Sequence, residues 1–371
     1  MLAPRERLSP LMALRLFAAI RIMLFHIVDW NEQPVWLRSI MTTPVGVTFF
    51  FVMSGFALTY VYDQQHELGR FSARRFYLGR VGRILPVYVF GLLVAIPLLA
   101  HSHAFRWGYA VATATLTQAW LPTGSQFWNY PLWALSAEAF FYLLFPFFLD
   151  GFRNTSARRL LMIAAAVWFL SLFPGLLYHW LHPDGLYYTS YLSSGFWLRV
   201  LKYNPLARLP EFVLGVIAGK LYLRRGGLNK WAAPAFTLAA VVIFGTLAYG
   251  RLFPYEVVNN GLLAPAIAVA VMSLASGGYW ARLFSNKALV LLGSSSYCIY
   301  VLHVPLWEYA HWLWPEALNQ SHPLSLLVAF GIVVISVVGY VIFEKPASAW
   351  ARAKLHAPSG APHALHAAAG K

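Results

Sequence analysis

The sequence predicts an all-α protein that crosses a membrane about ten times. Of its 371 residues, 59% are apolar and 11% are charged, and the mean hydropathy is +0.59. Soluble domains carry about 25% charged residues, so this composition argues against a water-soluble fold. In addition, apolar runs of about 18 residues or more recur along the whole chain, which is typical of membrane-spanning helices.

Each predicted span is an apolar run close to the ~20 residues that a helix needs to cross a bilayer. The first run is predicted to stay in the mature protein. Arg21 and His26 interrupt it and no small-residue cleavage site follows, unlike in a secretory signal peptide. In chain order, the ten runs cover residues 11–30, 43–62, 84–101, 131–149, 160–181, 205–223, 231–249, 257–276, 288–310 and 324–343.

An eleventh run, 107–121, is shorter and contains three threonines and a glutamine. If it does not cross, twenty basic residues fall on the side of the amino terminus and six on the other side, with Arg15 and Arg21 inside the first span. The positive-inside rule favours such an asymmetry of basic residues, and a crossing by 107–121 would destroy it. We therefore expect both termini in the cytoplasm and residues 102–130 outside it, with 107–121 re-entrant or interfacial. The six are Arg38, Arg106, Arg199, Lys202, Arg208 and Arg251.

The charge balance and the cysteine count exclude other classes of protein. Most of the net charge of +15 is explained as a topology marker, so no nucleic-acid partner is expected. Cys298 is the single cysteine, which excludes an internal disulfide and any multi-cysteine metal site, and no metal is expected. Residues 1–346 are predicted to form one membrane domain. Residues 347–371 are predicted to form a cytoplasmic tail with a disordered end.

Charges inside a membrane span are costly and are therefore candidates for function. The informative ones within the predicted spans are Arg15, His26, Glu138, Glu211 and His303. Arg15 and His26 are eleven residues apart on one helix face, about 16 Å along its axis. At about 1.5 Å per residue, His26 lies about 6 Å from the outer end of its span, and Glu138, Glu211 and His303 lie about 9 to 10 Å deep. These four groups predict an outer layer of titratable residues, with Arg15 in an inner layer.

Arg80 and Arg83 begin a span at the cytoplasmic side and are candidates for phosphate binding. They are three residues apart, hence on one helical face, and guanidinium groups bind phosphates in a fork geometry. Simpler roles are also open. Such arginines often only anchor topology, a membrane histidine often only bonds a neighbouring carbonyl, and Glu211 has Arg208 one turn earlier as an ion-pair partner.

In combination, these motifs resemble the acyltransferase 3 family of integral-membrane O-acyltransferases, which modify sugars and glycolipids in bacteria. The resemblance covers nearly all of 8–346. Ala139 and Gly79 depart from the pattern, since many members carry an acidic residue and an arginine there. The matching stretches are ALRLFAAIRIMLFH with Arg15 and His26, FFFVMSGFALTY (49–60), FYLGRVGRILPVY (76–88) with Arg80 and Arg83, WALSAEAFFYLLFP (133–146) with Glu138 and Tyr142, RLPEFVLG (208–215), LGSSSYCIYVLHVPL (292–306) and FEKP (343–346).

The resemblance implies a multi-pass acyltransferase of a bacterial inner membrane. It implies transfer of an acyl group, most often acetyl, from cytoplasmic acetyl-CoA or another acyl-CoA to a hydroxyl of a carbohydrate or lipid-linked glycan. In this hypothesis Arg80 and Arg83 hold phosphates of coenzyme A and Arg15 helps to place the donor. His26 removes the hydroxyl proton, and Glu138 orients His26.

The remaining candidates have supporting roles. Tyr142 is expected to donate to the developing oxyanion or simply to pack, and Glu211 and His303 are expected to support the substrate or the structure. Cys298 has no adjacent base in the sequence and is expected to be a packed small residue. Direct transfer in a ternary complex is therefore favoured, with an acyl intermediate on His26 as the alternative.

The acceptor and the class of protein each leave alternatives open. An exopolysaccharide repeat unit is the leading acceptor, beside lipopolysaccharide sugars, other glycolipids or a small secondary metabolite. A transporter of a polar or anionic metabolite would also use intramembrane Arg, His and Glu, but the sequence shows no inverted repeat and no paired broken helices. The concentration of costly charges disfavours a purely structural subunit of an assembly complex.

Overall fold

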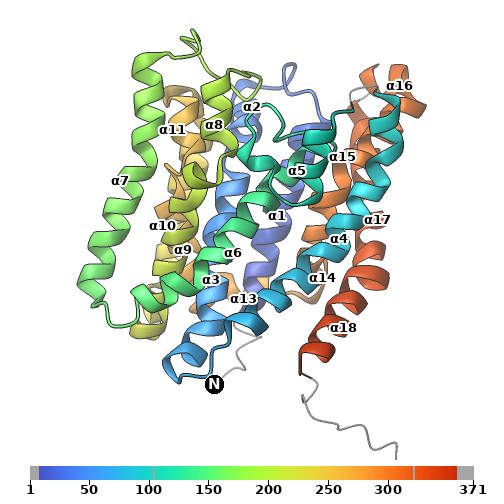
Figure 1. The fold of residues 1–371 in the computed structure, drawn as a ribbon. Coiled ribbons are helices and arrows are strands. Elements are labelled where there is room, and N and C mark those ends of the chain that lie inside the picture. Colours follow the sequence, from blue (N-terminus) through green and yellow to red (C-terminus); the bar gives the residue numbers. More distant parts are fainter. Residues whose placement is uncertain (1–7, 103–104, 321, 357–371) are drawn as a thin grey trace, which may run out of the picture.

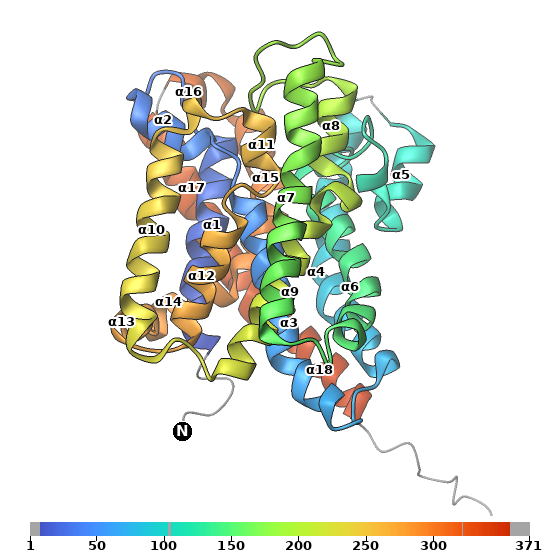
Figure 2. The same ribbon diagram turned by 90° about the vertical axis from the view of Figure 1, so that its left-hand side faces the viewer.

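The computed structural model describes residues 8–102, 105–320 and 322–356. Within these ranges the chain is helical and contains no β-strand, which confirms the predicted all-α class. The long helices run roughly side by side (Figures 1 and 2). The bundle comprises α1 (Ser9–Ile27), α3 (Gly46–Glu67), α4 (Ala73–His101), α6 (Trp133–Gly151), α7 (Ala157–Leu181), α9 (Pro205–Arg225), α10 (Ala232–Ala248), α12 (Ala264–Ala275), the short α14 (Lys287–Ser294) that leads into α15 (Ser296–Leu313), α17 (His322–Gly339) and α18 (Lys345–His356).

Short helices cover the two ends of the bundle. The end drawn uppermost in both views carries most of them, and we call it the upper end. The helix α13 (Tyr279–Phe284) lies at the opposite, lower end. The short helices at the upper end are α2 (Val35–Thr42), α5 (Trp107–Ala114), α8 (Phe196–Tyr203), α11 (Tyr255–Asn259) and α16 (Pro315–Gln320).

Among the described residues, eight helices are long and apolar enough to cross a membrane, and the pair α14–α15, bent by 55°, makes a ninth if it is one span. All ten apolar runs form helices. The run at 205–223 is α9, which is 21 residues long but carries Arg208, Glu211 and Lys220 in its interior, so its mean hydropathy is low. Buried side chains line most of α9, which places it inside the bundle rather than against lipid.

Helix α9 has clear sequence signals at both ends. Asn204 caps its amino terminus by accepting a 2.9 Å hydrogen bond from the backbone of Leu206, and Pro205 occupies the first turn. Gly226 follows its carboxyl terminus with φ of 70°, a left-handed conformation that glycine adopts without a steric penalty. These signals fix where the helix begins and therefore which face presents Arg208 and Glu211.

Helices α3 and α9 pack against each other through glycines. A Cβ atom on Gly55 would collide with the backbone carbonyl of Phe212, and one on Gly215 would collide with the carbonyl of Val52. Gly219, one turn further on, faces Thr59 in the same way. Small residues at such spacing let two membrane helices approach until their backbones touch. This contact forms the centre of the bundle.

Residues 107–121 do not form a spanning helix. They fold as α5 and a 3₁₀ turn, Gln118–Trp120, and an eight-residue helix is only about 12 Å long. Tyr88 on α4 donates to the carbonyl of Thr113, and Ser136 on α6 donates to that of Leu116 at 2.7 Å. The segment is thus fastened to two long helices at the upper end, in agreement with the non-crossing interpretation.

Helix α1 begins, and helix α18 ends, at the lower end of the bundle (Figure 1). This fits the prediction that the two ends share a side, whereas its assignment to the cytoplasm stays a prediction from the charge bias. The predicted boundary after residue 346 falls within continuous helical structure, because a π-helical turn, Tyr340–Glu344, leads directly into α18. Residues 357–371 of the predicted tail lie outside the described residues.

Candidate active site

The last turn of α1 meets α15 through two histidines. Nδ1 of His26 lies 2.8 Å from Nε2 of His303, and the two ring planes differ by only 7°. His303 is completely buried, and its Nδ1 lies 3.0 Å from the carbonyl oxygen of Ile299 one turn earlier. Two residues that the sequence placed in the same outer layer, on different helices, are therefore in direct contact.

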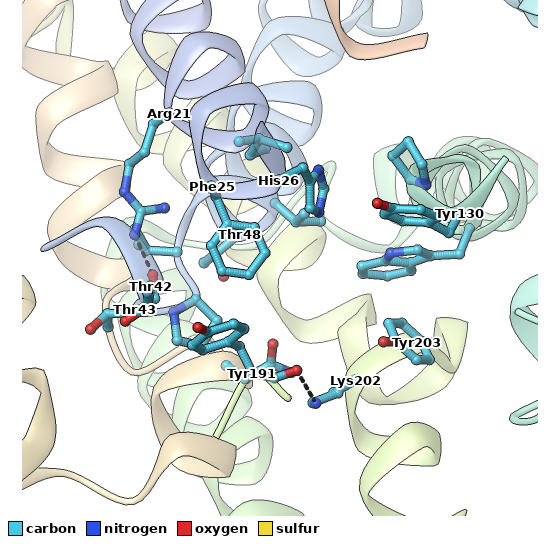
Figure 3. Close-up of a pocket in the computed structure, with 18 of the residues that line it drawn as sticks. Arg21, Phe25, His26, Thr42, Thr43, Thr48, Tyr130, Tyr191, Lys202 and Tyr203 are labelled. Atoms are coloured by element: carbon cyan, nitrogen blue, oxygen red, sulfur yellow. Dashed lines mark hydrogen bonds between the residues drawn. The ribbon is translucent and has the colours of Figure 1, made fainter. Parts of the chain in front are cut away.

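His26 forms part of the wall of a pocket at the upper end, with a cavity volume of about 150 Å³. In Figure 3 its ring stands beside that of Tyr130, with Phe25 and Tyr191 on the other side of the opening. The ring of Tyr130 meets the ring of His26 edge-on at 5.2 Å between centroids. The aromatic residues of the wall include Phe25, Tyr130, Trp133, Tyr191, Tyr203 and Tyr300.

The basic residues of the pocket wall are engaged by the protein itself. Arg21 donates to the carbonyl oxygens of Ile40, at 2.6 Å, and of Thr43. Lys202 donates to the carbonyl of Ser193 at 2.7 Å and to those of Ser190 and Tyr191 at 3.3 Å. These contacts fasten α2 and the segment before α8 around the opening.

Burial, together with the nearby charge of Arg199, lowers the pKa of Lys202 to about 8. Lys202 lies outside the candidate membrane spans, in α8, and only 4% of its surface is exposed.

Arg208, which lines the pocket, forms an ion pair with Glu211. Nε and Nη2 of Arg208 each lie 3.0 Å from a carboxylate oxygen of Glu211, and Thr48 donates to the same carboxylate at 2.9 Å. Both charged residues are at most 2% exposed. The ion pair with Arg208 that the sequence offered as the simpler alternative for Glu211 is present. These bonds join α9 to Thr48 on α3 and occupy both carboxylate oxygens, so Glu211 offers no free carboxylate to a substrate.

Glu138 does not face His26, which corrects the predicted pairing of these two residues. Its Oε1 accepts a 2.6 Å hydrogen bond from Ser54 on α3, and Ser54 also lies 3.2 Å from the hydroxyl of Tyr142. Counting residues placed Glu138 in the outer layer with His26, but its charge interacts with that of Arg15, which was predicted in the inner layer. A count along one helix gives neither the tilt of that helix nor the direction in which it turns a side chain. His303 takes the place beside His26 that Glu138 was expected to fill.

Tyr142 and Glu138 belong to a second polar cluster, which we call the arginine cluster: Arg15, Arg80, Arg83, Glu138, Tyr142 and Glu344. The guanidinium of Arg80 lies over the ring of Tyr142 at 5.9 Å and donates to the hydroxyl of Tyr62 at 3.4 Å. The charge of Arg15 interacts with those of Arg83, Glu344 and Glu138. Tyr142 therefore accompanies the arginines, and the structure does not place it at His26 as an oxyanion donor.

The arginine cluster holds two polar atoms with no protein partner. Within the described ranges, Nε of Arg15 and Nε of Arg80 are buried and make no hydrogen bond. An unmade hydrogen bond of a buried charged group is costly, so such atoms usually mark a ligand or ordered water. These two donors are available to bind an anionic ligand.

Glu344 is a member of the cluster that the sequence interpretation missed. Only 7% of it is exposed, and its Oε2 accepts a 3.1 Å hydrogen bond from Sγ of Cys298. The π-helical turn Tyr340–Glu344 turns this carboxylate inward, and such turns often occur at functional sites. The sequence did contain a signal, namely a carboxylate directly after a long apolar run. Cys298 is packed as expected.

Known proteins are similar to this chain over most of its length. A family model described as an acyltransferase domain matches residues 11–343. Acyltransferase MdmB of Streptomyces mycarofaciens is 27% identical over 383 aligned residues, which cover 92% of this chain and 91% of that protein. Nodulation protein 10 of Rhizobium leguminosarum bv. viciae is 24% identical, with 90% and 91% covered.

A third relative is longer. A protein of Staphylococcus aureus strain COL, named as a candidate O-acetyltransferase, is 25% identical over 80% of this chain, but the match spans only 50% of that protein. No solved structure matches this chain.

Proposed function

Since the chain belongs to the acyltransferase 3 family, we propose that it transfers an acyl group, acetyl in the simplest case, from a coenzyme A thioester to a hydroxyl of a carbohydrate or lipid-linked glycan. One observation carries this proposal. A single helix, α1, bears Arg15 in the arginine cluster and His26 in the wall of the pocket. Their spacing of eleven residues corresponds to about 16 Å, so one helix connects an anion-binding region to a candidate base.

The arginine cluster is the proposed donor end. The unpartnered Nε atoms of Arg15 and Arg80 can bind phosphate oxygens, and Arg83 adds a third guanidinium on the same face of α4 as Arg80. Glu344 and Glu138 balance part of this positive charge when no donor is bound. The composition of the cluster, three arginines and two carboxylates, suits an anionic ligand that exchanges rather than one held permanently.

The pocket is the proposed acceptor end. Its tyrosine and tryptophan rings offer flat surfaces on which the C–H faces of a sugar can pack, and their polar ends can bond hydroxyl groups. In the proposed step, Nε2 of His26 takes the proton of the acceptor hydroxyl as its oxygen attacks the thioester carbonyl. The carbon–sulfur bond then breaks, and the proton passes from His26 to the leaving thiolate of coenzyme A.

The setting of the reaction is part of the same proposal. The relatives described above come from bacteria, and the positive-inside bias places the arginine cluster toward the cytoplasm, where acyl-CoA is found. We therefore place the protein in a bacterial inner membrane. We take an exopolysaccharide repeat unit as the first acceptor to test.

The test uses purified protein in sealed vesicles with acetyl-CoA labelled in the acetyl group. The expected result is release of free coenzyme A that depends on an added glycan acceptor, with label on the glycan. The His26→Ala variant serves as the control and should give neither product. Label that accumulates inside the vesicles as intact acetyl-CoA would instead identify a transporter, and release without acceptor would identify a hydrolase.

A further inference from the structure

Both ring nitrogens of His303 are engaged, and their partners determine where its proton lies. Nδ1 contacts the carbonyl oxygen of Ile299, which can only accept a hydrogen bond, so Nδ1 must carry the hydrogen. In a neutral imidazole the other nitrogen is then an acceptor. A second proton would leave a cation on a side chain that is 0% exposed. No carboxylate in the described structure contacts it.

The proton position of His26 follows from that of His303. Because Nε2 of His303 is an acceptor 2.8 Å away, Nδ1 of His26 must be the donor. The lone pair of a neutral His26 therefore sits on Nε2. Among the described residues, this Nε2 makes no hydrogen bond, and it is not one of the buried polar atoms without a partner, so it is accessible. Because His26 lines the pocket, its accessible Nε2 faces the pocket.

We infer that His303 is a positioning residue, which holds His26 in the tautomer whose lone pair on Nε2 points into the pocket. The carbonyl of Ile299 determines the proton positions of both histidines, because it requires a hydrogen on Nδ1 of His303. The inference rests on the proposed function, in which His26 is the base. It assigns to a neutral histidine the task that a carboxylate performs in other histidine-dependent acyl transfers. No proton is transferred to His303, because its Nε2 only accepts a hydrogen bond from Nδ1–H of His26.

Two further contacts hold His303 in place. Pro305 lacks an N–H group, so the carbonyl of Val301 lacks its helical partner and instead accepts a 3.0 Å hydrogen bond from Asn129. Tyr300 donates to the carbonyl of Pro131 at 2.6 Å. Both contacts tie α15 to the segment that carries Tyr130, the ring that stands edge-on to His26. The histidine pair is thereby fixed from α1, from α15 and from the segment before α6.

The test compares amide substitutions of different length at His303. The carboxamide of His303→Gln reaches the position of Nε2 and can accept from His26, whereas that of His303→Asn reaches only the position of Nδ1. We expect His303→Gln to retain kcat within about tenfold of the wild type. We expect His303→Asn and His303→Phe to lose about 100-fold or more, with the KM for acyl-CoA changed by less than about threefold.

A second measurement does not depend on the folding of any variant. ¹⁵N shifts of wild-type protein with labelled histidine should show His26 protonated at Nδ1 and unprotonated at Nε2. A proton on Nε2, or a His303→Asn variant with wild-type kcat, would overturn the inference. Failure of the proposed function looks different: the wild-type protein would then show no acceptor-dependent release of coenzyme A, whatever the tautomer.

Discussion

Glu138 accepts a 2.6 Å hydrogen bond from the hydroxyl of Ser54 on the neighbouring helix α3. This contact, together with the charge interaction between Glu138 and Arg15, places the carboxylate in the arginine cluster, the proposed donor end. Glu138→Gln keeps an oxygen that accepts from Ser54 but removes a negative charge beside the arginines. We therefore expect the KM for acyl-CoA to change several-fold while kcat falls by less than about tenfold. A loss of about 1,000-fold in kcat with unchanged KM would restore the predicted role beside His26.

Removing the proposed base should stop the chemistry without disturbing the fold. His26→Ala is expected to lower the rate of acceptor-dependent transfer by about 100- to 10,000-fold, the range found for positioned general bases. His26 is only partly buried, so insertion into the membrane and binding of acyl-CoA should persist. Initial rates measured at saturating donor, beside a binding isotherm for the donor, separate the two effects.

The arginine cluster should control affinity for the donor. Arg80→Gln combined with Arg83→Gln is expected to raise the KM for acyl-CoA about tenfold or more, because charge-assisted hydrogen bonds to phosphate are lost. Arg74→Gln combined with Arg75→Gln makes the same charge change on the exposed first turn of the same helix and should leave KM nearly unchanged. Equal effects of the two double variants would show that only the general charge of this end matters.

Lys202 should produce a pH-dependent term in stability. Its pKa is lowered by burial from 10.5 to about 8, so between these values the unfolded chain binds a proton that the folded protein does not. The free energy of unfolding therefore rises with pH through this window, by at most about 1.4 kcal/mol per pH unit. Below about pH 8 the folded and unfolded states both carry the proton, so Lys202 adds no pH dependence there.

Thermal unfolding in detergent at about pH 7 and about pH 10 checks the sign. Wild type should gain stability relative to Lys202→Met on going to the higher pH, because methionine does not titrate. Parallel shifts of the two proteins would contradict the assignment.

The glycine contact between α3 and α9 should tolerate no side chain. Gly55→Ala is expected to lower the free energy of unfolding by about 1 to 3 kcal/mol, since the new Cβ meets the carbonyl of Phe212. Gly245→Ala is the matched control, because this glycine lies within α10 with open space around it. There, alanine should be neutral or stabilising by up to about 1 kcal/mol. Unfolding temperatures of the two variants in the same detergent provide the comparison.

Much of the fold could be predicted because the bilayer imposes simple rules. A long apolar run has to become a helix when no water is present to bond its backbone, and all ten runs did so. The short run at 107–121 was also interpreted correctly, since charge asymmetry is independent of helix length. The pair Arg208–Glu211 was foreseeable for a local reason: residues three apart on a helix are neighbours.

The candidate site was less predictable because it depends on rotations and contacts between distant segments. His26 and His303 are 277 residues apart in the chain, and nothing local indicates that their rings meet. Glu138 was expected in the same layer as His26, but it bonds Ser54 and lies near Arg15. Glu344 reaches the arginine cluster through a π-helical turn, which shifts the register of a helix in a way that apolar periodicity does not reveal.

Helix α1 has a consequence for which donors can react. Its only proline, Pro10, lies in the first turn, so the stretch from Arg15 to His26 is an uninterrupted helix. The separation between the two residues therefore stays constant even if the surrounding helices shift. A thioester bound through its phosphates reaches the imidazole only when the arm between them has a matching length. For the proposed reaction we therefore expect selection of the donor by molecular length as well as by charge, so truncated thioesters without the phosphate-bearing half should react poorly.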